Sequence, residues 1–132
     1  MNGRTASPVV PRLVPRLLPR LLNVRQRMRA AAVDALVVSH LPNIRYLTGF
    51  VGTAGLVVLT PTACSLIVDF RYQTVARALL SANPEAAAHF NVVVPAQSYD
   101  ETLADVLREC GARRIGIEAA HMPVSRFNRL AA

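Results

Sequence analysis

The residue types that most often perform catalysis or bind metal are few and widely separated in this chain. The histidines are His40, His89 and His121, and the cysteines Cys64 and Cys110 form no CxxC pair. Metal and nucleophile sites are usually marked by closely spaced ligands or by a set motif, and no HxxxH, HExxH, GxSxG or phosphate-loop pattern is present. We therefore predict no catalytic and no metal-binding residue in the chain.

The cysteines and two of the histidines have simple structural interpretations. Cys64 and Cys110 lie on apolar segments, which favours buried, unreactive thiols in a reducing compartment. His40 and His121 lie near prolines in expected loops. We expect both at the surface, and contact with a ligand is the less favoured alternative.

Asp69 is the acidic residue whose position is most informative. It follows an apolar run and precedes Arg71 and Tyr72, which open an amphipathic segment. A carboxylate at a helix N-terminus accepts backbone N–H bonds and meets the positive end of the helix dipole. We predict that Asp69 is a helix cap, with Tyr72 packed inward and Arg71 outward. The alternative is that its charge holds a neighbouring subunit or a substrate.

Charge is unevenly distributed along the 132 residues, which carry 15 basic and 8 acidic side chains. Residues 1–33 hold seven arginines and no acid, whereas residues 34–132 hold eight of each sign. The chain is 52% hydrophobic, which is enough for one domain with a true core. Because positive and negative charges are equal in number over residues 34–132, a nucleic-acid-binding domain is not expected.

Residues 1–18 contain a short Pro-Arg-Leu repeat. A proline every four residues removes helix donors and clashes with preceding carbonyls, so residues 11–18 should form no stable helix. We predict a disordered leader over 1–18 and a folded domain over 19–132. An electrostatic binding arm and a targeting peptide are the alternatives for the leader.

Apolar periodicity then predicts alternating helices and strands. Helices are expected over 19–32, from Asp69 to 83, from Ser98 to Gly111, and from 122 onward. Ser98 and Glu101 have the spacing of a capping box, and Tyr99 is expected on the apolar face of that helix. Strands are expected over 35–38, 56–59, 65–68, 91–94 and 115–117. Residues 44–47 should form a helical turn or a short connector after a turn that starts at 42–43. In the helix after Asp69, the expected buried face is Tyr72, Val75, Ala76, Leu79 and Leu80. The pattern indicates an α/β fold with a mixed sheet flanked by helices.

Residues 46–68 carry no charge and are long enough to cross a bilayer. Gly49, Gly52, Gly55 and Pro61 interrupt this run, and threonines dilute it. The better interpretation is a β-hairpin with its turn at residues 60–63.

Several ordered segments resemble the N-terminal domain of the creatinase/prolidase/aminopeptidase P family. They are Asp34–Val38 (DALVV), Pro42–Phe50 (PNIRYLTGF), Val68–Tyr72 (VDFRY) and Ile115–Glu118 (IGIE). The resemblance covers about residues 20–132 and implies a ribonuclease H-like architecture. The motif positions are Asn43, Arg45, Tyr46, Gly49, Asp69, Tyr72 and Glu118.

The resemblance implies that catalysis belongs to a C-terminal domain that this chain lacks. In the family, that domain supplies two Asp, one His and two Glu, which hold a pair of divalent metals, expected to be Mn, Co or Zn. The metals activate a water that attacks an Xaa-Pro peptide bond. The chain alone should therefore have no peptidase activity, although its parent protein would be an Xaa-Pro metallopeptidase.

The resemblance also implies a role for this domain in the full-length enzyme. It would contribute to subunit assembly and restrict access to the active site, with Phe50, Val51, Gly52, Thr53 and Arg71 near substrate. The expected partners are the C-terminal peptidase domain, a second copy in a homodimer or higher oligomer, and proline-containing peptides. A cytoplasmic location is expected, with no membrane or nucleic-acid partner.

The sequence also allows different positions for two aromatic side chains and two other functions for the domain. Tyr46 is expected in the core, and Phe50 could be either a core or a substrate-facing residue. One alternative function is a catalytically inert protein-binding module of the same fold. The other is an anionic-surface binder, for nucleic acid or membrane, that acts through Arg4 to Arg29.

Overall fold

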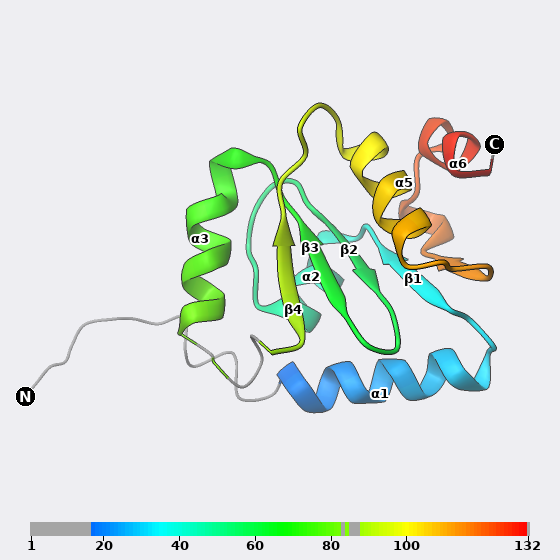
Figure 1. The fold of residues 1–132 in the computed structure, drawn as a ribbon, viewed down its shortest axis with the longest axis horizontal. Coiled ribbons are helices and arrows are strands. Elements are labelled where there is room, and N and C mark those ends of the chain that lie inside the picture. Colours follow the sequence, from blue (N-terminus) through cyan, green and yellow to red (C-terminus); the bar gives the residue numbers. More distant parts are fainter. Residues whose placement is uncertain (1–16, 83, 85–87, 132) are drawn as a thin grey trace, which may run out of the picture.

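The computed structural model describes residues 17–82, 84 and 88–131, in which a five-stranded sheet lies between two layers of helices (Figure 1). The strands are β1 (Ala35–Val38), β2 (Leu56–Leu59), β3 (Cys64–Ile67), β4 (Phe90–Val93) and β5 (Ile115–Ile117). The helices are α1 (Leu17–Ala30), α2 (Leu41–Thr48), α3 (Phe70–Ser81), α5 (Tyr99–Glu109), the short 3-10 helix η2 (Ala119–His121) and α6 (Val124–Ala131).

The sheet has the strand order β4-β3-β2-β1-β5 and is mixed, as predicted. β2 pairs antiparallel with both β1 and β3, whereas β1 pairs parallel with β5 and β3 pairs parallel with β4. Four strands therefore share one direction and β2 runs against them. The predicted hairpin is confirmed as β2 and β3, although β3 and β4 each begin one residue earlier than expected.

The strands are apolar on both sides because helices cover both faces of the sheet. Side chains alternate along β2: Val57 and Leu59 face the core under α1, α2 and α3, while Leu56 and Val58 face the core under α5. Leu103 of α5 belongs to this second core.

Helix α1 includes Leu17 and Leu18, two residues before its expected start. Leu17 is 2% exposed and belongs to the first core. Pro19 lies in the first turn, where a missing N–H has no intrahelical partner to lose. The rest of the predicted leader, residues 1–16, lies outside the described residues. On the buried side of α1, Arg25 donates from Nε to the carbonyl oxygen of Thr60 at 2.8 Å.

Helix α2 replaces the expected turn and short connector, and it corrects the placement of Tyr46. Ile44, Leu47 and Thr48 occupy the buried face at helical spacing, so Tyr46 points outward and is 50% exposed. The guanidinium of Arg20 covers the Tyr46 ring at 4.3 Å. Gly49 ends the helix in the left-handed conformation, with φ of 81°.

Two other predicted burials are wrong. Val75 is exposed, because the contact face of α3 is narrower than expected and is centred on Ala76 and Leu79. Cys110 is also exposed, because it is the C-cap residue that follows the last turn of α5 and lies beyond the buried face of Leu103 and Leu107. Cys64 is buried on β3 as expected, and burial raises the pKa of its thiol to about 12.

The uncharged run over residues 46–68 contains the end of α2, a loop and the β2–β3 hairpin. Among the helices of the described residues, none has the length and apolar content needed to cross a bilayer.

Candidate functional site

The functional candidates gather where the four co-directional strands end. β1, β3, β4 and β5 all finish at one edge of the sheet, and β2 begins there (Figure 1). The segments that follow these strands, together with the loop that enters β2, carry most of the predicted site residues. In open α/β sheets this edge is the usual position of ligand and partner sites.

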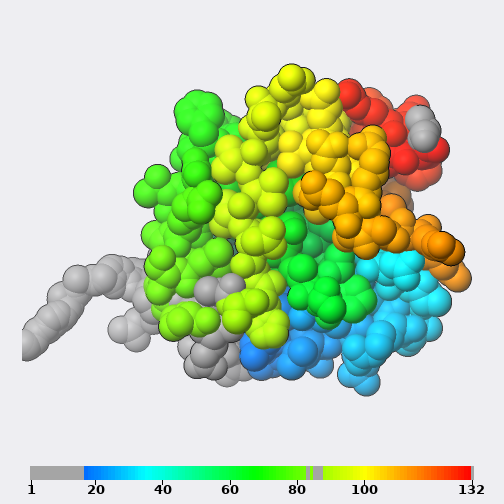
Figure 2. Space-filling view, viewed as in Figure 1, coloured from blue at the N-terminus to red at the C-terminus, as the bar shows by residue number. Residues whose placement is uncertain are grey.

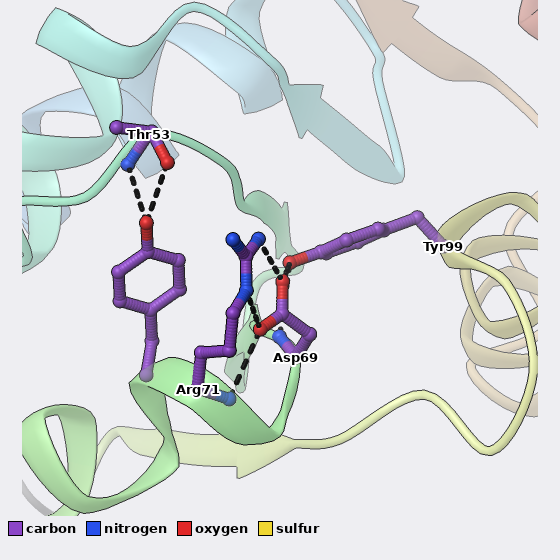
Figure 3. A network of polar contacts seen from close by, with 5 residues as sticks. Thr53, Asp69, Arg71 and Tyr99 are labelled. Atoms are coloured by element: carbon purple, nitrogen blue, oxygen red, sulfur yellow. Dashed lines mark hydrogen bonds and ion pairs between the residues drawn. The ribbon is translucent and has the colours of Figure 1, made fainter.

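Asp69 caps α3, as predicted, and it also forms an ion pair. Its Oδ1 accepts the backbone N–H of Arg71 at 3.0 Å, which is the N-cap hydrogen bond. The Arg71 side chain returns to the same carboxylate, with Nε donating to Oδ1 and Nη2 to Oδ2, both at 2.9 Å (Figure 3). Such a two-point contact fixes the direction of both side chains.

Tyr99, the first residue of α5, completes this group from the other side of the sheet. Its hydroxyl donates to Asp69 Oδ2 at 2.8 Å and accepts the Asp69 backbone N–H at 2.9 Å (Figure 3). Sequence reasoning missed this role and assigned Tyr99 only to the apolar face of its helix. The available signal was a tyrosine directly after the predicted cap Ser98, whose Oγ accepts the Glu101 backbone N–H at 3.1 Å.

These contacts shift the ionisation of the group in opposite directions. The hydrogen bonds from Arg71, and then from Tyr99, hold the pKa of the Asp69 carboxyl well below its usual range. Burial first, and the hydrogen bond to Asp69 second, raise the pKa of Tyr99 to about 12. Asp69 is therefore an anion and Tyr99 a neutral donor throughout the physiological range.

The loop that enters β2 is attached to α3 through Tyr72. The Tyr72 hydroxyl accepts the Thr53 backbone N–H at 3.2 Å and lies 2.5 Å from Thr53 Oγ1 (Figure 3). The Tyr72 ring meets Phe50 edge to face, with ring centres 5.5 Å apart. Phe50 is 2% exposed, so it is a core residue. A Cβ on Gly52 would lie 2.7 Å from the Phe50 ring, so only glycine fits between them without a shift.

The structure thus brings together four of the five residues expected near substrate. Phe50, Gly52 and Thr53 pack around Tyr72, and Arg71 lies beside it with its guanidinium carbon 5.2 Å from the Tyr72 ring centre. Val51, between them in sequence, is 59% exposed. The loop therefore presents an apolar side chain on a fixed base.

Glu118 organises a second group at the same edge, after β5. Its Oε1 accepts the backbone N–H groups of Ser39 at 2.8 Å and His40 at 2.9 Å, and Oε2 accepts from Asn43 Nδ2. His40 stacks on His121 with ring centres 3.7 Å apart. Glu118 and Asn43, from two of the recognised motifs, therefore meet and join β5 to the start of α2. Arg45 takes no part in either group, and its side chain is exposed.

The acidic side chains at this edge do not fit a metal centre. Asp69 is occupied by Arg71 and Tyr99, and Glu118 by two backbone amides and an amide side chain. Over the described residues, no group of three or more His, Cys, Asp or Glu is placed to hold a metal ion.

The fold and this edge together define a small mixed α/β domain whose polar groups fix loops in place. Residues 20–132 match the creatinase/prolidase N-terminal domain, and the chain belongs to this family. The family expected from the sequence motifs is therefore confirmed.

Known relatives place the domain within larger proteins. The chain is 30% identical over 95 residues to a Bacillus subtilis protein described as uncharacterized peptidase YqhT, matching 72% of this chain and 25% of that protein. The N-terminal domain of cytoplasmic peptidase PepQ from Mycobacterium tuberculosis H37Rv is similar in structure, with a TM-score of 0.72 and 28% identity. That match covers 86% of this chain and 82% of the other.

An Xaa-Pro dipeptidase from Bacillus anthracis shares the fold, with a TM-score of 0.76 at 23% identity. Its match covers 86% of this chain and 30% of the dipeptidase chain. The chain thus spans well under half the length of the Bacillus relatives that it matches.

Proposed function

We propose that this chain is the non-catalytic N-terminal part of an Xaa-Pro peptidase, where it contributes to subunit assembly and restricts access to the active site. The observation that carries the proposal is the fixed loop over residues 50–53. Its base is held by Phe50 in the core and by the Tyr72 contacts to Thr53, and it leaves Val51 exposed. An apolar side chain on a rigid loop suits a wall that selects by shape, for example against a proline ring.

The chemistry of the parent protein would come from elsewhere. A divalent metal pair of Mn, Co or Zn would belong to a C-terminal domain, since Asp69 and Glu118 at the polar edge are already engaged in structural contacts. The proposed partners are that domain, another copy of the chain, and proline-containing peptides. A cytoplasmic location is supported by the Mycobacterium tuberculosis relative, which is described as cytoplasmic.

A domain exchange tests this function. This chain replaces the N-terminal domain of the Bacillus anthracis Xaa-Pro dipeptidase, and hydrolysis of Xaa-Pro peptides is measured together with the oligomeric state. Val51→Asp should raise KM or change the preferred peptide length without altering metal content, because it alters the wall and not the metal site. The matched control is Leu22→Asp, which places the same charge at an exposed apolar position on α1, away from the loop, and should leave KM unchanged.

The same exchange separates the proposal from its alternative. If the chimaera assembles and is active but Val51→Asp has no effect on KM or peptide length, the access role is wrong. An inert protein-binding module would then account better for the domain.

A further inference from the structure

The positive charge of the described chain is concentrated on one side of the sheet. Helices α1 and α2 carry five arginines and no acid, and four of these arginines reach the surface: Arg20, Arg27, Arg29 and Arg45. On the opposite side, α5 and α6 together carry four acids and three arginines. Figure 2 shows α1, in blue, along the lower edge of the surface, well separated from α5, in yellow. The excess of arginine in residues 1–33 therefore appears in the fold as a basic helical layer, to which residues 34–132 add Arg45.

A shallow groove lies on this basic layer, between α1 and the exposed ring of Tyr46. The polar side chains that line it are Arg20, Asn23, Gln26, Arg27 and Tyr46. Arg20 is fixed there by its hydrogen bond from Nη1 to the Tyr46 carbonyl oxygen, at 2.9 Å, and by its position over the ring. Arg27 has no carboxylate partner among the described residues.

We propose that this α1–α2 groove binds single-stranded nucleic acid, an activity beyond the proposed peptidase role. Arginine contributes charge for the phosphates, and its planar guanidinium can also stack on a base. The Tyr46 ring and the Arg20 plane that covers it form a stacking platform, and the Asn23 and Gln26 amides can bond base edges. Charge together with an exposed aromatic ring is the combination that single strands require.

The composition of the groove argues against a membrane as its partner. Surface-bound helices insert large apolar side chains between their basic residues. The apolar side chains that line this groove are Val24, which is half-buried, and Ala30. The sequence before α1 adds Arg4, Arg12 and Arg16 without an acid, so the basic charge continues along the chain.

The test is fluorescence anisotropy of a labelled, mixed-sequence oligonucleotide of roughly 20 nucleotides with the full chain, over a range of salt concentrations. Arg20→Gln/Arg27→Gln should weaken binding about ten-fold and reduce the salt slope by about 1.4, since each lost phosphate contact on a single strand removes about 0.7. Tyr46→Leu should weaken binding roughly five-fold or more with little change in slope, because it removes stacking and not charge.

The matched control is Arg113→Gln/Arg114→Gln, which removes the same charge from an exposed loop on another part of the surface. This variant should bind the oligonucleotide almost as tightly as the unaltered chain does. If the double variant of α1 unfolds, the single variant Arg27→Gln is measured in its place. Arg27 is exposed and its side chain bonds to no described residue, so this substitution should not disturb the fold. Equal losses in the α1 and loop variants overturn the proposal. So does tighter binding to phosphatidylserine vesicles than to the oligonucleotide.

Discussion

At the scale of single residues, Asp69 combines three tasks that are usually separate. It caps α3, pairs with Arg71 and accepts the Tyr99 hydroxyl, so one carboxylate joins the ends of β3, α3 and α5. Its ion pair is with a largely exposed arginine, and such pairs contribute little to stability. The cap and the Tyr99 contact are therefore the parts that matter for folding.

This division of tasks predicts how two substitutions of Asp69 differ. Asp69→Asn keeps an oxygen for the Arg71 N–H and should lower the midpoint of urea unfolding only slightly. Asp69→Ala removes the cap and the carboxylate acceptor of the Tyr99 hydroxyl together and should lower the midpoint clearly more. If the two variants unfold at the same midpoint, with both well below the unaltered chain, the charge of Asp69 is needed for folding and the cap interpretation fails.

Asp69 and Asp34 should also make the domain sensitive to acid. Arg71 and Tyr99 lower the pKa of Asp69, and the backbone N–H groups of Arg113 and Arg114 lower that of Asp34. Because both folded pKa values lie below the unfolded value of about 4, the unfolded chain binds more protons in this window. The stabilisation is complete above about pH 4 and is lost as the pH falls through the folded pKa values.

Urea unfolding at a series of pH values measures this effect. The midpoint should be nearly constant from neutral pH to about 5 and should fall below about 4. Asp69→Asn should flatten the fall only slightly, by about as much as it lowers the midpoint at neutral pH, because the exposed ion pair contributes little. An identical acid dependence in the variant would show that Asp69 does not contribute to it.

At the scale of elements, the buried start of α1 decides where the domain begins. Leu17 lies in the core, whereas Leu22 of the same helix is 52% exposed. Leu17→Ala should reduce the free energy of unfolding by about 2–5 kcal/mol, and Leu22→Ala by less than about 0.5 kcal/mol. Chemical denaturation of both variants measures the difference. Equal, small losses would mean that the first turn of α1 is not part of the folded core.

The positions of Cys64 at the start of β3 and of Cys110 just after α5 predict different reactivity of the two thiols. Cys64 is buried on a central strand with a pKa raised to about 12, whereas Cys110 is exposed just after α5. A thiol reagent at neutral pH should therefore modify one cysteine in the folded chain and both in denaturant. Cys110→Ser should abolish the reaction of the folded chain. Rapid native modification of that variant would place Cys64 at the surface instead.

At the scale of the whole molecule, the domain has a polar edge built for positioning and a basic helical layer on one face of the sheet, and the two meet at the start of α2, where Asn43 donates to Glu118. The edge fixes loops through Asp69 and Glu118, and the basic layer gathers the arginines of α1 and α2. A positioning role in a larger protein and binding of an anionic partner thus depend on different side chains. Substitution of the exposed Arg27 of α1 leaves the contacts of Asp69 and Glu118 in place.

The contacts of the acidic residues at the edge also predict how the isolated chain behaves in a peptidase assay. It should hydrolyse no Xaa-Pro dipeptide or tripeptide in the presence of added Mn²⁺, Co²⁺ or Zn²⁺, because its acids at the edge are bound to arginine, tyrosine and backbone amides. The assay is release of proline-containing products, with and without a chelator. Turnover that depends on metal and follows the chain through purification would contradict this prediction.

Much of the fold could be predicted from the sequence because the relevant signals are local. Apolar runs such as Ala35–Val38 indicate strands that are buried on both faces, and capping residues such as Asp69 and Ser98 mark helix starts within a few positions. The family motifs at residues 42–50 and 115–118 were recognisable for the same reason. Exposed helix positions, such as Tyr46 and Val75, were misplaced because burial depends on which face of each helix the rest of the fold covers, and this cannot be read from the local sequence.

The sequence by itself therefore determined the family, the mixed α/β class and the caps, whereas the tertiary structure decided which loops meet. Tyr99 reaches Asp69 across 30 positions, and Glu118 reaches Ser39 across 79. These contacts depend on strand order and direction, which place the ends of β1, β3, β4 and β5 at one edge. No local pattern encodes such an arrangement, because it results from burying both faces of the whole sheet at once.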